Sequence, residues 1–203
     1  ILAIDKPSGI LVHPVPEQVR YGTSPDKKDY SKTILEIFKK KYPKLEIVHR
    51  LDKETSGVML LAKNKKAHEF LKKQFINREI KKTYIAIVDG WVKNDHGIIN
   101  KPIGRSPKDF RRHLSGRGAR GEMREAITEY KVLKRFTALV GKRPDLGNSK
   151  RSGLKETFQK FAYLEVKPKT GRTHQIRVHL KFLNHPVVGD TLYNPKRPLP
   201  NLP

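Results

Sequence analysis

Short apolar runs separated by polar turns recur along the chain and predict strands. Residues 1–14, "ILAIDKPSGILVHP", alternate between apolar and polar positions, turn at residues 6–9 and alternate again. This pattern predicts two short strands around a tight turn. Longer apolar runs bounded by polar residues predict further strands. These lie at Gly57–Ala62 and at residues 83–88, 126–133 and 161–166.

Three polar residues stand where a helix can begin. Thr33 precedes an apolar face and is followed three residues later by a Glu, which predicts a capping box. Thr173 can cap a helix over residues 174–183, with Asn184 as its left-handed stop. Asn64 can cap another helix. Its expected apolar side is formed by Ala67, Phe70, Leu71 and Phe75.

Polar and basic stretches interrupt this pattern. Residues 15–31 are typical of an exposed loop, and residues 101–124, with eight Lys or Arg, predict a mobile basic loop region. Residues 141–160 form a basic insertion longer than a hairpin needs, and such insertions are functional or disordered. Strands and helices mix without a regular βα period. The expected fold class is therefore α+β, with a mixed, mainly antiparallel sheet and helices packed on it.

The charge balance indicates a polyanionic partner. The chain of 203 residues has 44 Lys and Arg against 20 Asp and Glu, a formal net charge of +24. Nucleic acid is the commonest such partner. An anionic membrane surface is a weaker alternative, because the sequence holds no long apolar span and no basic amphipathic helix. The sequence has no Cys, which excludes disulfides, thiolate zinc sites and Cys nucleophiles. Nothing resembles a signal peptide, so a cytoplasmic location is expected.

A carboxylate stands just before a buried strand in "IVHRLDKETSGVMLLAKN". Asp52 follows Arg50, whose side chain could point the same way. The polar string after Asp52 includes Thr55 and Gly57. It offers N–H groups and hydroxyls in a tight turn, which can hold a carboxylate or a phosphate. Asp52 therefore either caps this turn or carries chemistry, and the segment itself leaves both open.

A second candidate lies in "KPKTGRTHQIRVHL", where a Gly turn leads into a helix. Arg172 and His174 lie at the helix N-terminus, where unpaired N–H groups and the dipole favour an anion. Arg177 lies one turn further on, beside the apolar face that holds Ile176. A partly buried Arg needs a carboxylate partner, and Asp52 is the conspicuous candidate. Such a pair would keep the carboxylate ionised.

The other polar residues give weaker signals. Tyr84 in "KKTYIAIV" is by its pattern an ordinary strand aromatic. The eight His residues show no metal-binding spacing, and the sequence has no Gly-rich phosphate loop. Neither a metal nor a nucleotide cofactor is therefore expected.

Together these blocks resemble the RluA-type pseudouridine synthases (RluA-, RluC- and RluD-like), which modify ribosomal and transfer RNA. "ILAIDKPSGILVHP" resembles the first motif of that family and "HRLDKETSGVMLLAKN" its catalytic motif. "KKTYIAIVDG" resembles the tyrosine motif, and "GRTHQIRVHL" with "HPVVGDTLY" the arginine motif. The resemblance implies one catalytic domain over residues 1–203. It also implies a curved mixed sheet flanked by helices and loops, with the active site in a basic cleft.

The resemblance also implies a role for each candidate side chain. Asp52 corresponds to the catalytic aspartate, acting either as a nucleophile or as a base at the 2′ carbon. Arg50 corresponds to the arginine that enters the base stack as the target uridine flips out. Tyr84 would lie against the base, Arg177 would pair with the aspartate, and Ile176 would line the base pocket. Uridine isomerises without redox change or phosphoryl transfer, so no cofactor is implied.

The expected substrate is large-subunit ribosomal RNA, with transfer RNA as the alternative, and a monomer is expected. The rival hypothesis is a non-catalytic RNA-binding or ribosome-assembly module, which the charge alone favours equally. The intact set of Asp52, Tyr84 and Arg177 argues against that rival. An RNA base deaminase would need Cys and His ligands for zinc, and the sequence has no Cys.

The chain departs from the family pattern in three places, one of which is that the family's usual final strand, after "GDTLY", is not visible in this sequence. It begins inside an apolar run and ends in a proline-rich stretch, so both ends are expected to be truncated. Many family members carry a small RNA-binding domain of S4 type before the first motif, and none is visible in this sequence. The insertion at residues 141–160 either helps to choose the RNA target or is a disordered surface loop.

Overall fold

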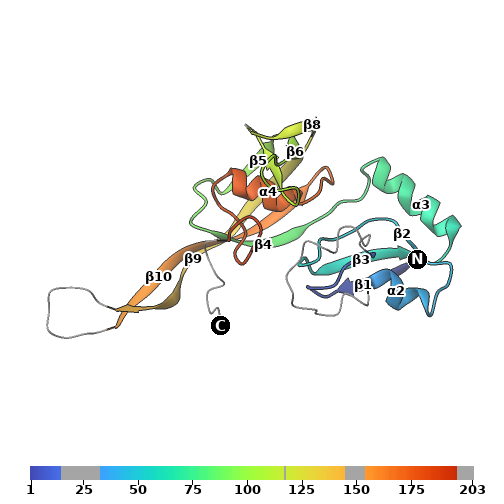
Figure 1. Cartoon of the computed structure of the whole chain (residues 1–203), viewed down its shortest axis with the longest axis horizontal. Helices are drawn as coiled ribbons and strands as arrows, with labels where there is room; N and C mark the ends of the chain where they lie inside the picture. The colour runs from blue at the N-terminus through green and yellow to red at the C-terminus, as the bar shows by residue number, and fades with distance from the viewer. Residues whose placement is uncertain (15–32, 117, 145–153, 196–203) are drawn as a thin grey trace. The chain divides into compact units, whose positions relative to one another are not determined.

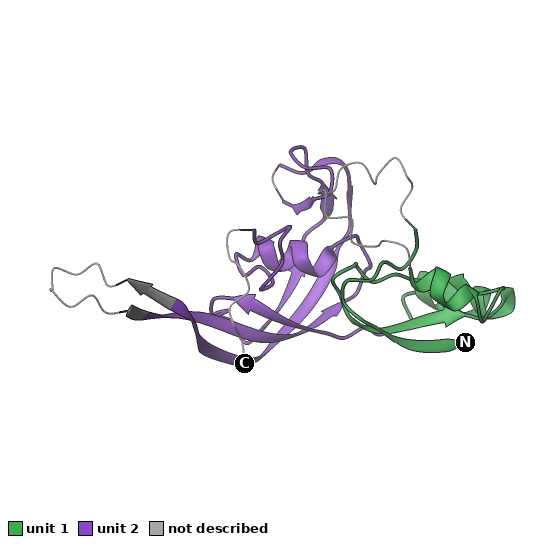
Figure 2. Cartoon of the chain, turned by 60° about the horizontal axis from the view of Figure 1, so that its bottom comes forward, with its two compact units in different colours: residues 1–80 green, residues 81–203 purple. Residues whose placement is uncertain are grey.

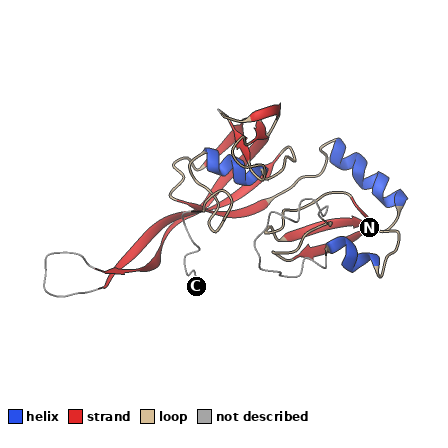
Figure 3. Cartoon of the chain, viewed as in Figure 1, coloured by secondary structure: helices blue, strands red, loops and turns tan. Residues whose placement is uncertain are grey.

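The computed structural model describes the backbone of residues 1–14, 33–116, 118–144 and 154–195. The chain divides into two compact units, Ile1–Ile80 and Lys81–Pro203, which Figure 2 colours separately. Strand pairs in the described ranges are antiparallel, and short helices accompany them (Figure 3). The expected α+β class with a mainly antiparallel sheet is therefore confirmed. The expectation of one catalytic domain over the whole chain stays a prediction.

The first unit is built around a three-stranded antiparallel sheet. Strand β3 (Gly57–Ala62) lies between β1 (Leu2–Lys6) and β2 (Glu46–Ile47) (Figure 1). The apolar run predicted β3, and its side chains Met59 and Leu61 are fully buried. A central strand must pair on both edges, and its burial fixes the register of both neighbours.

The second predicted strand, at residues 10–14, is wrong. The carbonyls of Leu11 and Val12 instead accept the N–H groups of Ile34 and Leu35, at 2.9 and 3.0 Å. These donors belong to the first turn of helix α2 (Ile34–Lys39). Because the first N–H groups of a helix have no partner within it, this segment satisfies them rather than a strand ladder.

Both predicted helices of the first unit form where their caps predicted. Thr33 and Glu36 make the reciprocal capping box of α2. In α3 (Lys65–Ile76), the side chain of Asn64 accepts the N–H of Ala67 at 3.0 Å. Phe70, predicted on the apolar side, is 59% exposed, whereas its neighbour Leu71 is buried. The buried stripe of α3 is thus narrower than the sequence pattern indicated.

The larger sheet of the second unit has the strand order β4-β10-β9-β5. Its strands are β4 (Tyr84–Asp89), β5 (His96–Asn100), β9 (Ile127–Pro144) and β10 (Leu154–Pro168). Helix α4 (Gln175–Phe182) contributes Leu180 to the core. The helix packs with Val88 of β4 and with Leu164 and Val166 of β10. The strands predicted from residues 83, 126 and 161 onward are therefore confirmed, although β9 and β10 run longer than expected.

The extra length of β9 and β10 lies in the predicted insertion. Beyond the stretches that pair with β4 and β5, the two strands continue as a two-stranded ribbon (Figure 1). Residues 141–144 and 154–160 are part of this ladder. Residues 145–153 lie outside the described residues, as does the whole of the loop predicted at residues 15–31. The role of the insertion therefore stays a prediction.

The basic loop region predicted at residues 101–124 is instead a small antiparallel sheet of order β7-β6-β8. Its strands are β6 (Ile103–Arg105), β7 (His113–Ser115) and β8 (Arg120–Arg124). Ile103 is buried and packs with Ala126, Val178 and Tyr193. The apolar pattern missed this sheet because its strands have three to five residues each and Ile103 is the one buried side chain among the three, which leaves almost no periodic signal.

None of the helices in the described ranges is long and apolar enough to cross a membrane.

Candidate active site

The loop that carries Asp52 joins β2 to β3 and is held by a buried lysine. The ammonium group of Lys6 donates to the carbonyls of Pro7, Lys53 and Thr55 at 2.8, 2.9 and 2.9 Å. Lys6 is fully buried, and burial lowers the pKa of its ammonium group, against the opposing effect of the carboxylates of Glu54 and Asp52. Three carbonyls arranged around one ammonium supply the hydrogen bonds that a buried charge requires.

The turn after Lys6 adds two further bonds to the same loop. The N–H of Gly9 donates to the carbonyl of Lys53 at 2.9 Å, and the Ser8 hydroxyl donates to that of Glu54 at 2.8 Å. Three successive carbonyls of the loop, from residue 53 to residue 55, therefore accept bonds from the first sequence block. The residues "KPSG" of the first block therefore hold the loop that carries Asp52.

Asp52 and Arg50 lie side by side in this loop but differ in exposure. The Asp52 side chain is half-buried, whereas Arg50 is exposed. The carbonyl of Asp52 accepts the N–H of Thr55 at 3.1 Å, which closes a tight turn as predicted. On the other side, the Nε2 of His49 accepts the N–H of Leu60 at 3.0 Å, so the loop is tied to β3 at both ends. The structure thus gives Asp52 a fixed backbone and Arg50 an outward position.

Gly57 ends this loop with a backbone that favours glycine. Its φ is +122°, outside the region that side chains readily allow, although an added Cβ would meet no atom within 4 Å. The Thr55 carbonyl is taken by Lys6, and the Thr55 N–H by Asp52. Thr55 and Gly57 therefore shape the turn through their backbones. Their expected contact with the substrate stays a prediction.

Tyr84 and Ile176 come together in the second unit. Tyr84 is the first residue of β4 and pairs with Val166 of β10. Both Tyr84 and Ile176 are half-buried and pack on the core cluster that contains Leu164 and Leu180. The ammonium group of Lys82 also donates to the carbonyl of Thr170 at 3.0 Å, which ties the start of β4 to the turn before α4.

Arg177 has a carboxylate partner in the second half of the arginine motif, "HPVVGDTLY". Its Nε and a terminal NH₂ donate to the two oxygens of Asp190, at 2.7 and 2.9 Å. Asp190 is buried and also accepts the N–H groups of Leu192 and Tyr193, each at 3.0 Å. Burial raises the pKa of the Asp190 carboxyl, but the Arg177 bonds and these N–H groups outweigh it and leave the pKa below its usual value. The predicted pairing of Arg177 with Asp52, which belongs to the other unit, stays a prediction.

The start of α4 is shaped by a glutamine that sequence reasoning did not single out. The predicted cap, Thr173, is wrong: the N-cap is His174, which has a left-handed backbone with φ 53° and no side-chain capping bond. The buried Gln175 accepts from the Thr170 hydroxyl at 2.7 Å and from the Arg172 N–H at 2.9 Å. Its NH₂ donates to the carbonyl of Ile127 and the hydroxyl of Thr128, at 3.0 and 2.9 Å. The glutamine therefore joins the turn before α4 to β9.

Arg172 and His174, predicted to bind an anion, both have partners within the second unit. The Nε of Arg172 donates to the Glu125 carbonyl at 2.9 Å. The Nδ1 of His174 is hydrogen-bonded to the Tyr193 hydroxyl at 3.0 Å, and that hydroxyl accepts the N–H of His113 at 3.0 Å.

Two further groups are buried and have structural partners. His179 is fully buried between the Thr128 hydroxyl and the Lys101 carbonyl, at 2.8 and 2.9 Å, and burial lowers its pKa. The carboxylate of Asp89 accepts from the amides of Gln159 and Asn194, at 2.7 and 2.5 Å.

Sequence reasoning did not single out Asp190 or Asn194, although a signal for both existed. Both follow Gly189 in the polar end of "HPVVGDTLYN".

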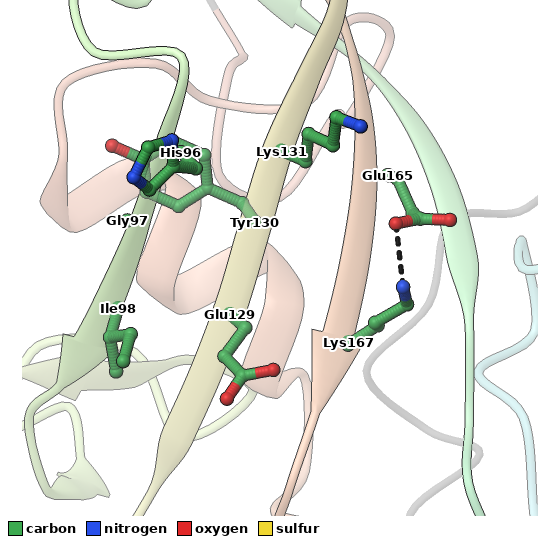
Figure 4. A pocket seen from close by; sticks show the side chains of 8 residues that line it. All are labelled: His96, Gly97, Ile98, Glu129, Tyr130, Lys131, Glu165 and Lys167. Carbon is green, nitrogen blue, oxygen red and sulfur yellow. Dashed lines mark ion pairs between the residues drawn. The ribbon is translucent and has the colours of Figure 1, made fainter.

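A cavity of about 260 Å³ lies on the larger sheet, apart from the predicted site residues (Figure 4). Glu129, Glu165 and Lys167 line it, and Lys167 pairs with Glu165 at 2.7 Å. The ring of Tyr130 lies against Gly97, where an added Cβ would approach within 2.7 Å of it.

Over the described ranges, no three His, Asp or Glu side chains are grouped so that they could hold a metal ion.

Comparison with known proteins identifies the family. The family model described as RNA pseudouridylate synthase matches residues 1–182. An uncharacterized RNA pseudouridine synthase of Aquifex aeolicus is 42% identical over 95% of this chain and 53% of its own length. The ribosomal large subunit pseudouridine synthase D of Borreliella burgdorferi is 36% identical over 95% of this chain and 52% of its own length. The chain thus spans about half the length of these two relatives.

A third relative and two solved structures agree. The dual-specificity RNA pseudouridine synthase RluA of Yersinia pestis is 34% identical over 95% of this chain and 77% of its own length. The structure of human RNA pseudouridylate synthase domain containing 1 aligns with a TM-score of 0.65 and 28% identity, over 80% of this chain and 60% of that one. Human RNA pseudouridylate synthase domain containing 4 aligns with a TM-score of 0.63 and 28% identity, over 94% of this chain and 64% of that one. The chain belongs to the RNA pseudouridylate synthase family and, within it, to the RluA type.

Proposed function

We propose that this chain catalyses the isomerisation of uridine to pseudouridine in structured RNA, with Asp52 as the catalytic carboxylate. The observation that carries the proposal is the family match over residues 1–182, which includes Asp52, Tyr84 and Arg177. In this reaction the N1–C1′ bond breaks, the uracil turns, and C5 bonds to C1′. No atom is gained or lost and no electron is transferred to a carrier, so no cofactor is required.

RNA binding rests first on charge. The net charge of +24 favours a polyanion and predicts an affinity that falls steeply with salt. A target base inside folded RNA must be extruded before it can react, at a cost of a few kcal/mol. The exposed side chain of Arg50, two residues before Asp52, is available to fill the space that the base leaves. Its guanidinium can stack on neighbouring bases while it stays charged.

The chemical step is assigned to Asp52. Its carboxylate acts as a nucleophile or as a base at the 2′ carbon, and both routes need a fixed, ionised group. The backbone of its loop is held by Lys6, which supports such positioning. Tyr84 stacks on the uracil and accepts the C5 proton, and Ile176 helps to exclude water. Exclusion matters because water would otherwise hydrolyse the intermediate and leave an abasic RNA.

Arg177 orients the reacting groups and is itself oriented by Asp190. A guanidinium bonded at two of its nitrogens to a buried carboxylate has little rotational freedom. We propose that the ion pair with Asp190 sets the direction in which the Arg177 guanidinium meets the reacting groups. The pairing of Arg177 with Asp52 belongs to this proposal.

We propose large-subunit ribosomal RNA as the substrate and a monomer as the working form. The substrate assignment is supported by the printed name of the Borreliella burgdorferi relative, a ribosomal large subunit pseudouridine synthase. The Yersinia pestis relative is named as a dual-specificity enzyme, so modification of transfer RNA is the alternative outcome of the test below.

The proposal is tested by mapping pseudouridine in total RNA from cells with and without the protein, using carbodiimide labelling and primer extension. Asp52→Asn is supplied in parallel. The matched control is Glu54→Gln, because Glu54 is a carboxylate two residues away with a side chain 68% exposed. Stops that vanish without the protein and return with wild type and Glu54→Gln, but not with Asp52→Asn, support the proposal and identify the RNA. If no stop changes, a non-catalytic RNA-binding module becomes the better explanation.

A further inference from the structure

The turn between β6 and β7 presents an aromatic side chain to solvent. Phe110 is 77% exposed, more than any other large apolar side chain in the described part of the chain. Single exposed apolar residues are common and need no explanation by themselves. The surroundings of Phe110 distinguish it, because its turn is held by several hydrogen bonds and is strongly basic.

Asp109 holds the turn in one conformation. Its carboxylate accepts the backbone N–H of Arg111 at 3.0 Å and the Arg111 guanidinium at 3.0 and 2.9 Å. Its carbonyl accepts the N–H of Arg112 at 2.9 Å, and the N–H of Ser106 closes the turn on the Arg112 carbonyl at 3.0 Å. The bonds from Arg111 to the carboxylate lower the pKa of the Asp109 carboxyl to about 2. Phe110 therefore projects from a turn whose neighbouring residues are both fixed.

The charge of the small sheet is complementary to RNA. Residues 101–124 hold eight Lys or Arg and two acids, and those two acids are Asp109 and Glu122. Arg105 of β6 lies opposite Arg120 of β8 in the strand register, so like charges face each other on neighbouring strands. Like charges placed opposite each other are unfavourable unless an anion lies between them or solvent screens them. A basic surface with an exposed aromatic is the arrangement that binds the phosphates and bases of single strands.

The base of the same hairpin is bonded to the arginine motif. The N–H of His113, three residues after Phe110, donates to the Tyr193 hydroxyl at 3.0 Å. The guanidinium carbon of Arg177 lies over the Tyr193 ring, 5.0 Å from the centroid of that ring. Three residues span roughly 10 Å at most, so Phe110 lies a short distance from this group. RNA bound near Arg177 would extend past the turn.

We propose that Phe110 is a stacking contact for an unpaired base of the RNA substrate, beside the target nucleotide, and that Asp109 is its positioning residue. The proposal rests on the proposed RNA-modifying function and goes beyond it by naming a contact outside the four sequence blocks. Stacking on an aromatic is tolerant of base identity, because every base has a π-face. A turn already fixed by Asp109 loses little conformational freedom when the base arrives.

The test measures the affinity of the intact chain for a fluorescein-labelled single-stranded RNA without self-complementarity, and for the same strand in a blunt duplex. Phe110→Ala should weaken single-strand binding about 5- to 150-fold. It should leave duplex binding and the salt dependence unchanged, because no phosphate contact is lost. Phe110→Trp should retain affinity and Phe110→Leu should not. Ile98→Ala, at a site 68% exposed beside Glu129, is the control for loss of exposed apolar surface.

Asp109→Ala separates positioning from charge. Removal of a carboxylate beside a polyanion should tighten binding if only charge matters, whereas loss of the fixed turn should weaken it. The matched control is Glu122→Ala, in the same small sheet, with a side chain 73% exposed and paired with Arg124. Glu122→Ala should bind RNA at least as tightly as wild type.

Three results would overturn the inference. These are wild-type affinity in Phe110→Ala, equal affinity in Phe110→Leu and Phe110→Trp, or tighter binding in Asp109→Ala. The binding assay does not depend on catalysis. A chain that binds RNA through Phe110 but forms no pseudouridine would refute the proposed function and leave this contact in place. A chain that forms pseudouridine with unchanged binding in Phe110→Ala would do the opposite.

Discussion

Arg177 and Asp190 form a two-bond ion pair that joins helix α4 to the turn after it. The Nε–Oδ2 and NH₂–Oδ1 distances are 2.7 and 2.9 Å, and the Asp190 side chain is almost fully buried. A buried carboxylate with two charge-assisted bonds and two N–H donors is well satisfied. Removal of its charge would leave Arg177 partly buried without this partner, and such losses cost about 3–5 kcal/mol.

Asp190→Asn should therefore destabilise the protein by about 3 kcal/mol near neutral pH and lower the rate of pseudouridine formation. The folded-state pKa of Asp190 is held below its unfolded value, so its contribution is present above about pH 4 and is lost as pH falls through the lower, folded pKa. The difference between wild type and Asp190→Asn in the free energy of unfolding should shrink below about pH 4. Urea unfolding at a series of pH values measures it. Asp5→Asn, at an exposed position of β1, is the control, and an equal pH dependence in both variants would contradict the prediction.

Lys6→Met should destabilise the loop that carries Asp52. The substitution keeps an unbranched side chain one atom shorter but leaves the carbonyls of Pro7, Lys53 and Thr55 without their ammonium donor. Hydrogen bonds to charged groups contribute about 1.5–3 kcal/mol each, partly offset by the desolvation of the lysine, so a net loss of about 2–4 kcal/mol is expected. Chemical denaturation measures the loss, and hydrogen exchange should report faster opening at residues 53–55. Unchanged exchange there would show that Lys6 does not hold the loop.

Gly57→Ala tests the backbone at the end of the same loop. An added Cβ meets no neighbour, so the cost is that of the φ of +122° alone. We expect a destabilisation of about 1–3 kcal/mol. Gly171→Ala is the matched control, because its Cβ would meet only the Lys82 Nζ at 3.6 Å, an ordinary contact. Equal stability of the two variants would mean that the loop relaxes to accept a side chain.

Tyr84→Phe separates stacking from proton transfer. The ring remains on the core cluster, so we expect substrate binding to persist while the hydroxyl is lost. Release of tritium from RNA labelled at C5 of uridine should slow by about 10²-fold or more, as for loss of a general base. Tyr84→Ala should weaken RNA binding as well. Tritium release at the wild-type rate from Tyr84→Phe would assign the proton to another group.

Several elements could be read from the sequence because their signals are local. The capping box of Thr33 and Glu36 and the cap at Asn64 depend on residues three apart. The apolar run of β3 and the left-handed stop at Asn184, with φ 62°, are equally local. The site candidates came from motifs in the same way. The contacts between them did not, since Asp190 is separated from Arg177 by 13 residues and Lys6 from Thr55 by 49.

The antiparallel α+β class, the main strands and the family can all be predicted from the sequence, because apolar periodicity, caps and motif blocks are encoded in short stretches. Which polar groups are paired depends on how the folded chain brings distant residues together. Residues 10–14 form no strand because two of their carbonyls accept the first N–H groups of α2. The short strands β6 to β8 form a sheet whose buried side chain, Ile103, packs on residues distant in the sequence. Gln175, rather than Thr173, organises the start of α4. Buried donors and acceptors must find partners wherever the chain brings them together, and that requirement is not local.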